Sequence, residues 1–423
     1  MTASETNGFT SVCVIGLGYV GLPTAAVLAS RGLDVLGVDI DANTVALVND
    51  GKVPIVEPEL DTLVNGAVAK GKLRAATEPA PADAFIIAVP TPFADGHKPD
   101  LSYVEAATRA LAPHLATGNL VIVESTVPVG TTEAVSGWLA ETRPDLSFPH
   151  AAGEAADVSV AHSPERVLPG RVLLELVGND RVIGGVTPKC AERTALLYAI
   201  AVQGDLHRTT ARTAELVKLA ENAYRDVNIA FANELSLVCD KLGVDVWEAV
   251  ALANRHPRVE VLKPGPGVGG HCIAVDPWFI VDSAPEETRL IQAARTINDS
   301  KPAHVARQVV AGLTDPASAT VACLGLAYKA DIDDLRQSPS VDVVRELALA
   351  GVGNLLVVEP HTEVLPEALS DLDAVSLAEL DAALDAAEAV VLLTDHQPFR
   401  QLASDRLEGM KVFDTRGAWR PVT

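Results

Sequence analysis

Residues 12–39 read VCVIGLGYVGLPTAAVLASRGLDVLGVD, and this stretch decides the fold of the N-terminal part of the chain. It opens with a short apolar run of strand character, and a turn of the pattern G-x-G-x-x-G follows at residues 16–21. A segment of helical composition comes next, and a second apolar strand then ends at Asp39. Glycines at this spacing allow a tight turn and a close approach of the backbone to a pyrophosphate at the helix N-terminus. The stretch therefore predicts a strand–helix–strand unit that binds a dinucleotide.

The acidic residue at the end of the second strand indicates which dinucleotide this is. Asp39 lies 23 residues after Gly16. A carboxylate in this position accepts hydrogen bonds from a ribose 2′-hydroxyl and repels a 2′-phosphate, which favours NAD over NADP. The predicted NAD-binding residues of the unit are Gly16, Gly18, Tyr19, Val20, Gly21 and Asp39.

Two further apolar strands, at 84–89 and 120–123, fit the same sheet, and a threonine follows each of them. Ligands of an open parallel sheet bind beyond the carboxyl ends of its strands. We therefore expect Thr91 and Thr126 where a cofactor or substrate would lie. The alternative for each threonine is an N-cap of the following helix.

The composition limits the class of protein. With 423 residues, 48% of them hydrophobic and 21% charged, the chain is expected to form two or three globular domains. Its net charge of −23 argues against nucleic acid or an anionic membrane as a general partner. The first ten residues show no signal peptide and no apolar run approaches about 18 residues, so we expect a cytoplasmic protein without a membrane span. Five scattered cysteines, without a CxxC pair or a metal-type cluster, indicate reduced thiols and no metal site.

Residues 212–242 contain neither glycine nor proline, and their apolar residues recur at helical spacing. This pattern predicts one long helix that joins two domains and offers a dimer surface. Lys218 and Asn222 lie four residues apart and share one face, where a cation and an amide could stabilise an oxyanion. The alternative for this pair is an ordinary solvated helix face.

Residues 264–278 read PGPGVGGHCIAVDPW, and four glycines crowd the approach to one thiol, Cys272. We expect the glycines to let the backbone come close to a ligand. A thiol at the start of a helix feels the positive end of the helix dipole, which favours the thiolate. Asp276 would lie one helical turn further on, as an acid/base group beside a nucleophile. The alternative is a buried structural cysteine in a glycine-rich loop.

The C-terminal part repeats the alternation of apolar strands and helices, which implies a second parallel sheet. Its first turn, after residues 320–324, lacks G-x-G-x-x-G, so a second full NAD site is not expected. Lys329, Arg336 and Arg416 follow strand ends and could hold phosphates, or form surface salt bridges. We predict an α/β fold of two Rossmann-like, doubly wound parallel-sheet domains joined by a long central helix. We expect three domains. Residues 1–207 bind NAD, residues 208–300 form the dimer and carry the cysteine loop (264–278), and residues 301–423 bind the substrate.

An NAD domain combined with a nucleophilic thiol suggests a particular chemistry. Oxidation of an alcohol gives an aldehyde, the thiolate adds to it, and a second oxidation gives a thioester that water hydrolyses to an acid. A lysine and an asparagine would stabilise the oxyanions, and a carboxylate would activate the water.

Six motifs occur along the chain in the order seen in one enzyme family. They are Gly16-x-Gly18-Tyr19-Val20-Gly21, Ser125-Thr126-Val127-Pro128-x-Gly130, Ser163-Pro164-Glu165-Arg166, Glu215-x-x-Lys218-Leu219-x-x-Asn222, Gly269-Gly270-His271-Cys272 and Gly325-x-Ala327-Tyr328-Lys329. Over most of its length the chain thus resembles the UDP-glucose/GDP-mannose dehydrogenase family. The resemblance implies an enzyme that oxidises C6 of a nucleotide sugar to a carboxylate with two NAD⁺ per turnover.

The resemblance also implies roles for individual residues. The implied catalytic residues are the nucleophile Cys272, the oxyanion-stabilising pair Lys218 and Asn222, the acid/base groups Asp276 and Glu165, and Thr126 for positioning water. Thr91 and Thr126 would lie near the nicotinamide, and Arg336 would reach the cofactor from the C-terminal domain. The implied substrate-binding residues are Glu165, Arg166, Lys218, Asn222, Arg258, Gly269, His271, Tyr328, Lys329 and Arg416, with Arg258 reaching across a homodimer.

Departures from the glucose branch of the family narrow the implied substrate. That branch typically has Ser before the cysteine and Lys before the aspartate, whereas this chain has His271 and Val275. The segment 166–170 also lacks the glutamate of the glucose branch. Both changes resemble the N-acetylhexosamine branch and imply a UDP-N-acetylhexosamine, above all UDP-N-acetyl-D-mannosamine, with a uronate product used for surface polysaccharides. UDP-N-acetylglucosamine and UDP-glucose are the alternatives.

Two other classes of protein share part of this pattern. A catalytically inactive NAD-sensing or regulatory protein would need neither Cys272 nor Lys218 nor Asp276. A two-electron dehydrogenase of the 3-hydroxyacyl or 6-phosphogluconate type would need neither the cysteine nor a second α/β domain at 320–417. The thiol and the second domain together favour the four-electron enzyme.

Overall fold

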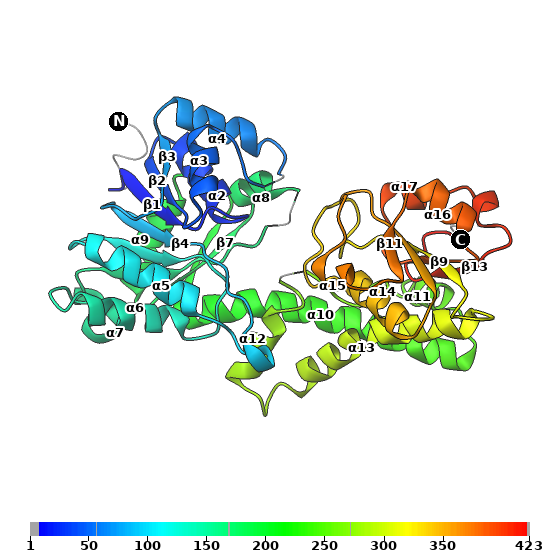
Figure 1. Cartoon of the computed structure of the whole chain (residues 1–423). Helices are drawn as coiled ribbons and strands as arrows, with labels where there is room; N and C mark the ends of the chain where they lie inside the picture. The colour runs from blue at the N-terminus through cyan, green and yellow to red at the C-terminus, as the bar shows by residue number, and fades with distance from the viewer. Residues whose placement is uncertain (1–7, 56, 168–169, 271, 421–423) are drawn as a thin grey trace. The chain divides into compact units, whose positions relative to one another are not determined.

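The computed structural model describes residues 8–55, 57–167, 170–270 and 272–420 (Figure 1). The chain forms two compact units, which are described separately below. The first comprises Met1–Ala220 and Trp278–Ser283, and the second comprises Glu221–Pro277 and Ala284–Thr423. The three-domain division expected from the sequence stays a prediction.

The first unit contains an eight-stranded sheet in the order β3-β2-β1-β4-β5-β6-β7-β8. Neighbouring strands are parallel except β6 and β7, which are antiparallel. The strands are β1 Ser11–Ile15, β2 Asp34–Val38, β3 Leu73–Ala76, β4 Ala84–Ile87, β5 Leu120–Val123, β6 Ser159–His162, β7 Arg181–Gly185 and β8 Leu206–Thr210.

Helices cover both faces of this sheet, as alternate residues of β1 show. Val12 and Val14 face one apolar core, and Cys13 and Ile15 face another. This two-sided burial explains why the central strands read as continuous apolar runs. The helices are α2 Gly21–Ser30, α3 Ala42–Asn49, α4 Leu60–Ala69, α5 Ser102–Leu111, α6 Thr131–Thr142, α7 Pro149–Ala152, α8 Val172–Gly178 and α9 Pro188–Tyr198.

The predicted central helix is confirmed as α10, Ala211–Leu242, which begins in the first unit and ends in the second. The next helices along the chain are α11 Val246–Ala253, α12 Asp276–Ser283 and α13 Arg289–Gly312. Among the described residues, no helix is both long and apolar enough to cross a membrane.

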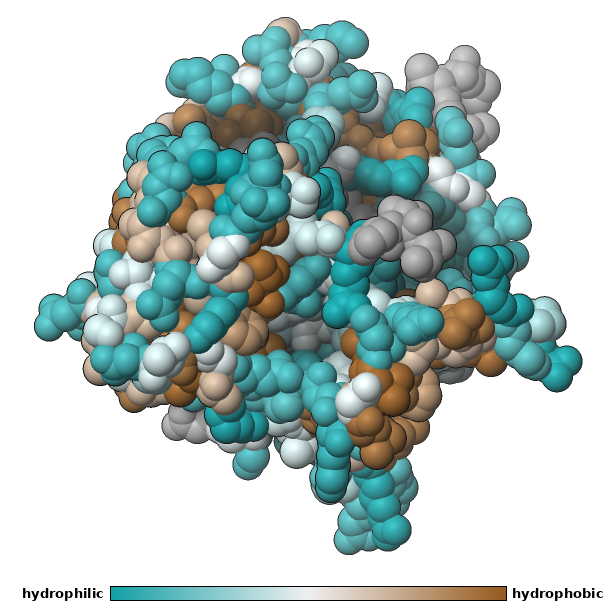
Figure 2. All heavy atoms as spheres, turned by 90° about the vertical axis from the view of Figure 1, so that its right-hand side faces the viewer, coloured by the Kyte–Doolittle hydropathy of each residue, from teal (hydrophilic) through white to brown (hydrophobic). Residues whose placement is uncertain are grey.

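The second unit contains a five-stranded parallel sheet in the order β11-β10-β9-β12-β13. Apolar cores lie on both of its faces, so the predicted pair of doubly wound α/β domains is confirmed. Hydrophilic side chains predominate on the face drawn in Figure 2, with smaller hydrophobic patches between them. The elements are β9 Thr320–Leu324, α14 Pro339–Leu349, β10 Asn354–Val358, α15 Glu367–Ser370, β11 Val375–Leu377, α16 Leu380–Ala386, β12 Ala389–Leu392, α17 Gln397–Arg400 and β13 Lys411–Asp414.

Candidate active site

In the first unit, the three glycines of the turn between β1 and α2 have three different environments. Gly16 has a φ of +96°, and a Cβ there would lie 2.4 Å from the carbonyl oxygen of Ala88. A Cβ at Gly21 would lie 1.9 Å from the carbonyl oxygen of Gly16. A Cβ at Gly18, in contrast, would meet no described atom within 4 Å. Gly16 and Gly21 therefore shape the turn, and Gly18 leaves its outer side open to a pyrophosphate.

Asp39 lies directly after β2 and organises this turn. One carboxylate oxygen accepts the N–H of Leu17 at 2.9 Å, and the other accepts the N–H of Asp41 at 3.0 Å. Helix α2 begins after Tyr19 and Val20, and its first turn carries no acidic residue. The open N–H groups of a helix start suit an anion. The predicted residues thus form a surface that fits NAD.

Thr91 and Thr126 are brought together at the carboxyl ends of β4 and β5. The hydroxyl of Thr91 donates to the backbone oxygen of Thr126 at 2.7 Å. Neither threonine is a helix cap, because the N-caps of α5 and α6 are Leu101 and Gly130. Both threonines are half-buried at the edge of the sheet where ligands bind.

The position of Lys218 on α10 depends on Glu215, a residue of the same sequence motif. Sequence reasoning did not interpret this residue. Glu215 is buried, and its carboxylate accepts the N–H groups of Gly130 and Thr132 at 2.6 and 2.7 Å. It also accepts the hydroxyl of Thr132 at 2.5 Å. Glu215 therefore fixes α10 to the N-terminus of α6, and the half-buried Lys218 follows one turn later.

His162, the last residue of β6, was also missed. It is fully buried, and neither ring nitrogen has a hydrogen-bond partner among the described residues. Burial lowers the pKa of His162 to about 3, and the positive charge of Lys218 acts in the same direction. The imidazole is therefore neutral at physiological pH.

Glu165 lies in a buried charge cluster of the first unit. Its carboxylate pairs with Arg181, a residue that sequence reasoning did not single out, and accepts the N–H of Arg166 at 2.7 Å. Arg181 also bonds Glu124, at 2.9 Å. Burial raises the pKa of Glu124 above its ordinary value. The antiparallel direction of β7 brings Arg181, its first residue, to the carboxyl edge of β6.

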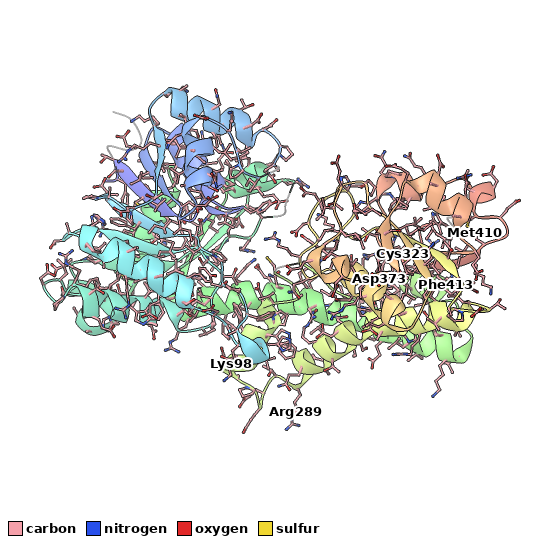
Figure 3. The ribbon with its side chains drawn as sticks, viewed as in Figure 1. Lys98, Arg289, Cys323, Asp373, Met410 and Phe413 are labelled. Carbon is pink, nitrogen blue, oxygen red and sulfur yellow. The ribbon has the colours of Figure 1, made fainter. Side chains whose placement is uncertain are left out.

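In the second unit, Cys272 differs from the other cysteines. It is half-buried, whereas Cys13, Cys190, Cys239 and Cys323 are buried. Burial raises the pKa of Cys323, on β9 within the second sheet (Figure 3), to about 12. Cys272 lies one turn before α12, since its carbonyl oxygen accepts the N–H of Asp276 at 2.8 Å. Cys272 thus lies in the turn that leads into α12, whose first residue is Asp276.

Asp276 and Asn222 lie together in the second unit. The amide of Asn222 donates to a carboxylate oxygen of Asp276 at 2.6 Å, and Asp276 is 3% exposed. Helix α10 thereby holds the segment that follows the thiol. Lys218 and Asn222 follow each other on successive turns of this helix, as predicted.

The two glycines directly before Cys272, Gly269 and Gly270, are packed against protein. A Cβ at Gly269 would lie 2.5 Å from the backbone oxygen of Gln337, and one at Gly270 would lie 2.9 Å from the ring of Tyr328. Gly270 has a φ of +87°, and its N–H binds the backbone oxygen of Arg336 at 3.2 Å. The loop therefore needs glycine to fit against residues 328–339.

The remaining predicted cations of the second unit have different environments. Arg416 lies beside the start of the cysteine loop, because a Cβ at Gly265 would be 3.0 Å from its guanidinium. Arg336 forms a two-pronged salt bridge with Asp334, at 2.8 and 2.7 Å. Lys329 and Arg258 are exposed. His271 lies outside the described residues.

A buried polar network, which sequence reasoning did not identify, binds the start of the cysteine loop at Gly265. The side-chain oxygen of Asn233 accepts the N–H of Gly265 at 2.9 Å, and its amide donates to Asn298 at 2.8 Å. Asn298 and Arg295 both donate to Asp226, at 2.8 and 2.6 Å. The network joins α10 to α13 beneath the loop.

The second sheet repeats the turn geometry of the first with a different outcome. Gly325 follows β9 with a φ of +91°, and Glu359 after β10 accepts the N–H groups of Leu326 and Ala327 at 2.6 and 3.1 Å. Glu359 is buried and also binds a ring nitrogen of His396 at 3.1 Å. Both carboxylates thus bind backbone N–H groups, but Glu359 is buried, whereas Asp39 is half-exposed.

The fold and the glycine turn define an NAD-dependent oxidoreductase with two Rossmann-like domains. The chain belongs to the UDP-glucose/GDP-mannose dehydrogenase family, whose NAD binding domain matches residues 10–202, central domain 212–300 and UDP binding domain 322–421. It is therefore a nucleotide-sugar dehydrogenase that uses NAD and a UDP-sugar.

Individual relatives match along nearly the whole chain. An NDP-N-acetyl-D-galactosaminuronic acid dehydrogenase of Ralstonia nicotianae is 59% identical, over 97% of this chain and 96% of that protein. A UDP-N-acetyl-D-mannosamine dehydrogenase of Campylobacter jejuni is 56% identical, over 95% and 99%. The solved structure of the UDP-D-ManNAc dehydrogenase of Pyrococcus horikoshii has a TM-score of 0.87 at 39% identity, over 97% and 96%.

Proposed function

We propose that this enzyme oxidises C6 of UDP-N-acetyl-D-mannosamine to the carboxylate through a covalent intermediate on Cys272. The observation that carries the proposal is the setting of this thiol. Cys272 is the half-buried cysteine, and it lies one turn before a helix whose first residue, Asp276, is held by Asn222. Nucleophile, carboxylate and amide are thus grouped as covalent catalysis requires.

In this mechanism NAD⁺ supplies the hydride acceptor, once for each of two oxidations. The thiolate of Cys272 adds to the C6 aldehyde, and oxidation of the resulting thiohemiacetal leaves a thioester on the sulfur. Lys218 and Asn222 stabilise the oxyanions of both tetrahedral species. Asp276 and Glu165 move protons, Thr126 helps to position the water that hydrolyses the thioester, and the carboxylate product leaves.

The identity of the sugar rests on the relatives and on the cysteine segment. Val275, where the glucose branch carries lysine, is 7% exposed and packs into the protein. The similar proteins carry two substrate names, and two Ralstonia relatives at 59% and 57% identity are named for N-acetyl-D-galactosaminuronic acid. A UDP-N-acetyl-D-galactosamine-type substrate is therefore the second candidate.

Purified enzyme with NAD⁺ and each of UDP-ManNAc, UDP-GlcNAc, UDP-GalNAc and UDP-glucose tests the proposal. We expect two NADH per UDP-ManNAc and the highest kcat/KM for that sugar. A higher kcat/KM for UDP-GalNAc would establish the second candidate. One NADH per sugar would rule out the four-electron reaction.

The proposal includes a homodimer in the cytoplasm that makes a precursor of surface polysaccharide. Helix α10 exposes Tyr224, Phe231 and Val238 at seven-residue intervals, and a second copy of the helix can cover such a stripe. Arg258, exposed in the single chain, would then reach the neighbouring site. All five cysteines are free thiols, as in a reducing compartment.

A further inference from the structure

One buried guanidinium in the first unit is shared by two carboxylates. Arg181 is 4% exposed at the start of β7, and it binds Glu124 at 2.9 Å through one terminal nitrogen and Glu165 through the other. Its guanidinium carbon lies 4.2 Å from the centre of the Tyr198 ring, and the hydroxyl of Tyr198 donates to Glu124 at 3.0 Å. The planar fork of arginine can serve two acids in this way, whereas a lysine ammonium is a single point charge.

The same cluster reaches the dinucleotide helix. The hydroxyl of Thr24, on α2, donates to the second carboxylate oxygen of Glu124 at 3.1 Å. Helix α2 begins at Gly21, the last glycine of the dinucleotide turn. A continuous chain of contacts therefore runs from α2 through Glu124 and Arg181 to Glu165.

Arg181 also limits the orientation of Glu165. One carboxylate oxygen of Glu165 pairs with Arg181, and the other accepts the N–H of Arg166 at 2.7 Å. The terminal nitrogen of Arg181 that binds Glu124 also donates to the hydroxyl of Ser163 at 3.3 Å. Both ends of the segment 163–165 are therefore held. The Glu165 side chain is 8% exposed and is fixed from two sides.

We infer that Arg181 is a positioning residue, which orients Glu165 for its acid/base step and ties that orientation to the dinucleotide helix through Glu124. The inference rests on the proposed acid/base role of Glu165. Arg181 acts through Glu165, so removal of Glu165 function should make Arg181 irrelevant to the rate. Coupled residues show this non-additivity, whereas independent residues do not.

The test compares Arg181→Lys, Glu165→Gln and the double variant. The control is Arg208→Lys, an exposed arginine of the same unit that pairs with Glu192. We expect Arg181→Lys to lower kcat by about 10–100-fold, as loss of a supporting contact does elsewhere, with little change in KM for NAD⁺. Intact-mass spectrometry during turnover should show the sugar acyl group accumulating on the enzyme. The double variant should be no slower than Glu165→Gln, and the control should match wild type.

The outcomes separate the inference from the proposed function. Normal turnover by Glu165→Gln would remove the acid/base role itself. If Glu165→Gln lowers kcat and the double variant has a still lower kcat, the inference is overturned while the proposed function stands. If Arg181→Lys does not fold, Glu124→Gln replaces it, because this change keeps the shape of the side chain while weakening its hold on Arg181. The same non-additivity with Glu165→Gln is then expected, and additive losses would overturn the inference.

Discussion

Asn222 donates a hydrogen bond of 2.6 Å to Asp276 across 54 residues of sequence. The bond joins the middle of α10 to the first residue of α12. The N–H of Asp276 in turn binds the carbonyl oxygen of Cys272 at 2.8 Å. The long helix therefore helps to define where the thiol lies, in addition to carrying Asn222, the proposed oxyanion donor.

Asn222→Ala should lower kcat by about 10²–10³-fold, the usual loss for one oxyanion donor. NAD⁺ affinity should stay unchanged, since the glycine turn is untouched. Steady-state kinetics and NAD⁺ titration check both expectations. The control is Asn228→Ala on the same helix, whose amide donates to the backbone oxygen of Tyr224 at 2.7 Å. A kcat for Asn222→Ala within threefold of this control would contradict the assigned role.

Gly18 and Gly21 should respond differently to the same substitution. A Cβ at Gly18 meets open space, so Gly18→Ala should fold normally and weaken NAD⁺ binding, because the methyl group occupies the approach of the pyrophosphate. A Cβ at Gly21 would lie 1.9 Å from a carbonyl oxygen, so Gly21→Ala should lower the unfolding free energy by about 1–3 kcal/mol. Thermal unfolding and NAD⁺ titration of both variants distinguish the effects. Equal stability losses would show that Gly18 is not open.

His162 should make the protein sensitive to mild acid. Its folded pKa of about 3 lies below the ordinary 6.5, so the unfolded chain binds the extra proton first. The part of the stability that depends on an uncharged His162 is fully present above pH 6.5 and is lost as the pH falls towards 3. Between pH 7 and pH 5 this amounts to about 2 kcal/mol. Urea denaturation should show that the unfolding free energy of His162→Leu falls by about 2 kcal/mol less than that of wild type between pH 7 and pH 5. His256→Leu, at an exposed histidine, should behave as wild type.

Substitution by alanine should destabilise the protein more at Gly270 than at Gly351, a glycine of similar backbone conformation with no atoms near its Cβ position. Gly270 and Gly351 have φ values of +87° and +83°, but only Gly270 would bring a Cβ within 2.9 Å of the Tyr328 ring. Gly351→Ala should cost about 1–2 kcal/mol for the left-handed backbone and keep full activity. Gly270→Ala should cost a further ~1–3 kcal/mol for overpacking and should lose activity with the displaced loop. Equal unfolding free energies for the two variants would contradict the packing argument.

Much of the fold could be predicted because local patterns determined it. The glycine turn, Asp39 and the apolar runs located the first sheet, and the uninterrupted stretch 212–242 matched α10 to one residue. The direction of β7 could not be predicted, because the five residues RVIGG read the same in parallel and antiparallel pairing. Arg181 was therefore missed, since only the antiparallel direction brings it to Glu165.

The faces of α10 were also beyond sequence reasoning. Periodicity predicts a helix with an apolar face inward. In the second unit the opposite holds for several positions, since Asp226 and Asn233 are fully buried while Tyr224 and Phe231 are 73% and 55% exposed. One carboxylate oxygen of Asp226 accepts a hydrogen bond from Arg295, which is distant in sequence and therefore invisible to a local pattern.

This exposed apolar face leads to a prediction about assembly. Tyr224, Phe231 and Val238 are spaced by seven residues, so they lie along one side of α10 where a second copy can pack. Phe231→Glu would bury a charge in that contact and should convert a dimer into a monomer in sedimentation velocity at micromolar concentration. Leu349→Glu is the control, because Leu349 is 66% exposed on a different helix, α14. Since Arg258 would complete the neighbouring site, the monomer should also lose activity, and an active monomeric Phe231→Glu would exclude that role for Arg258.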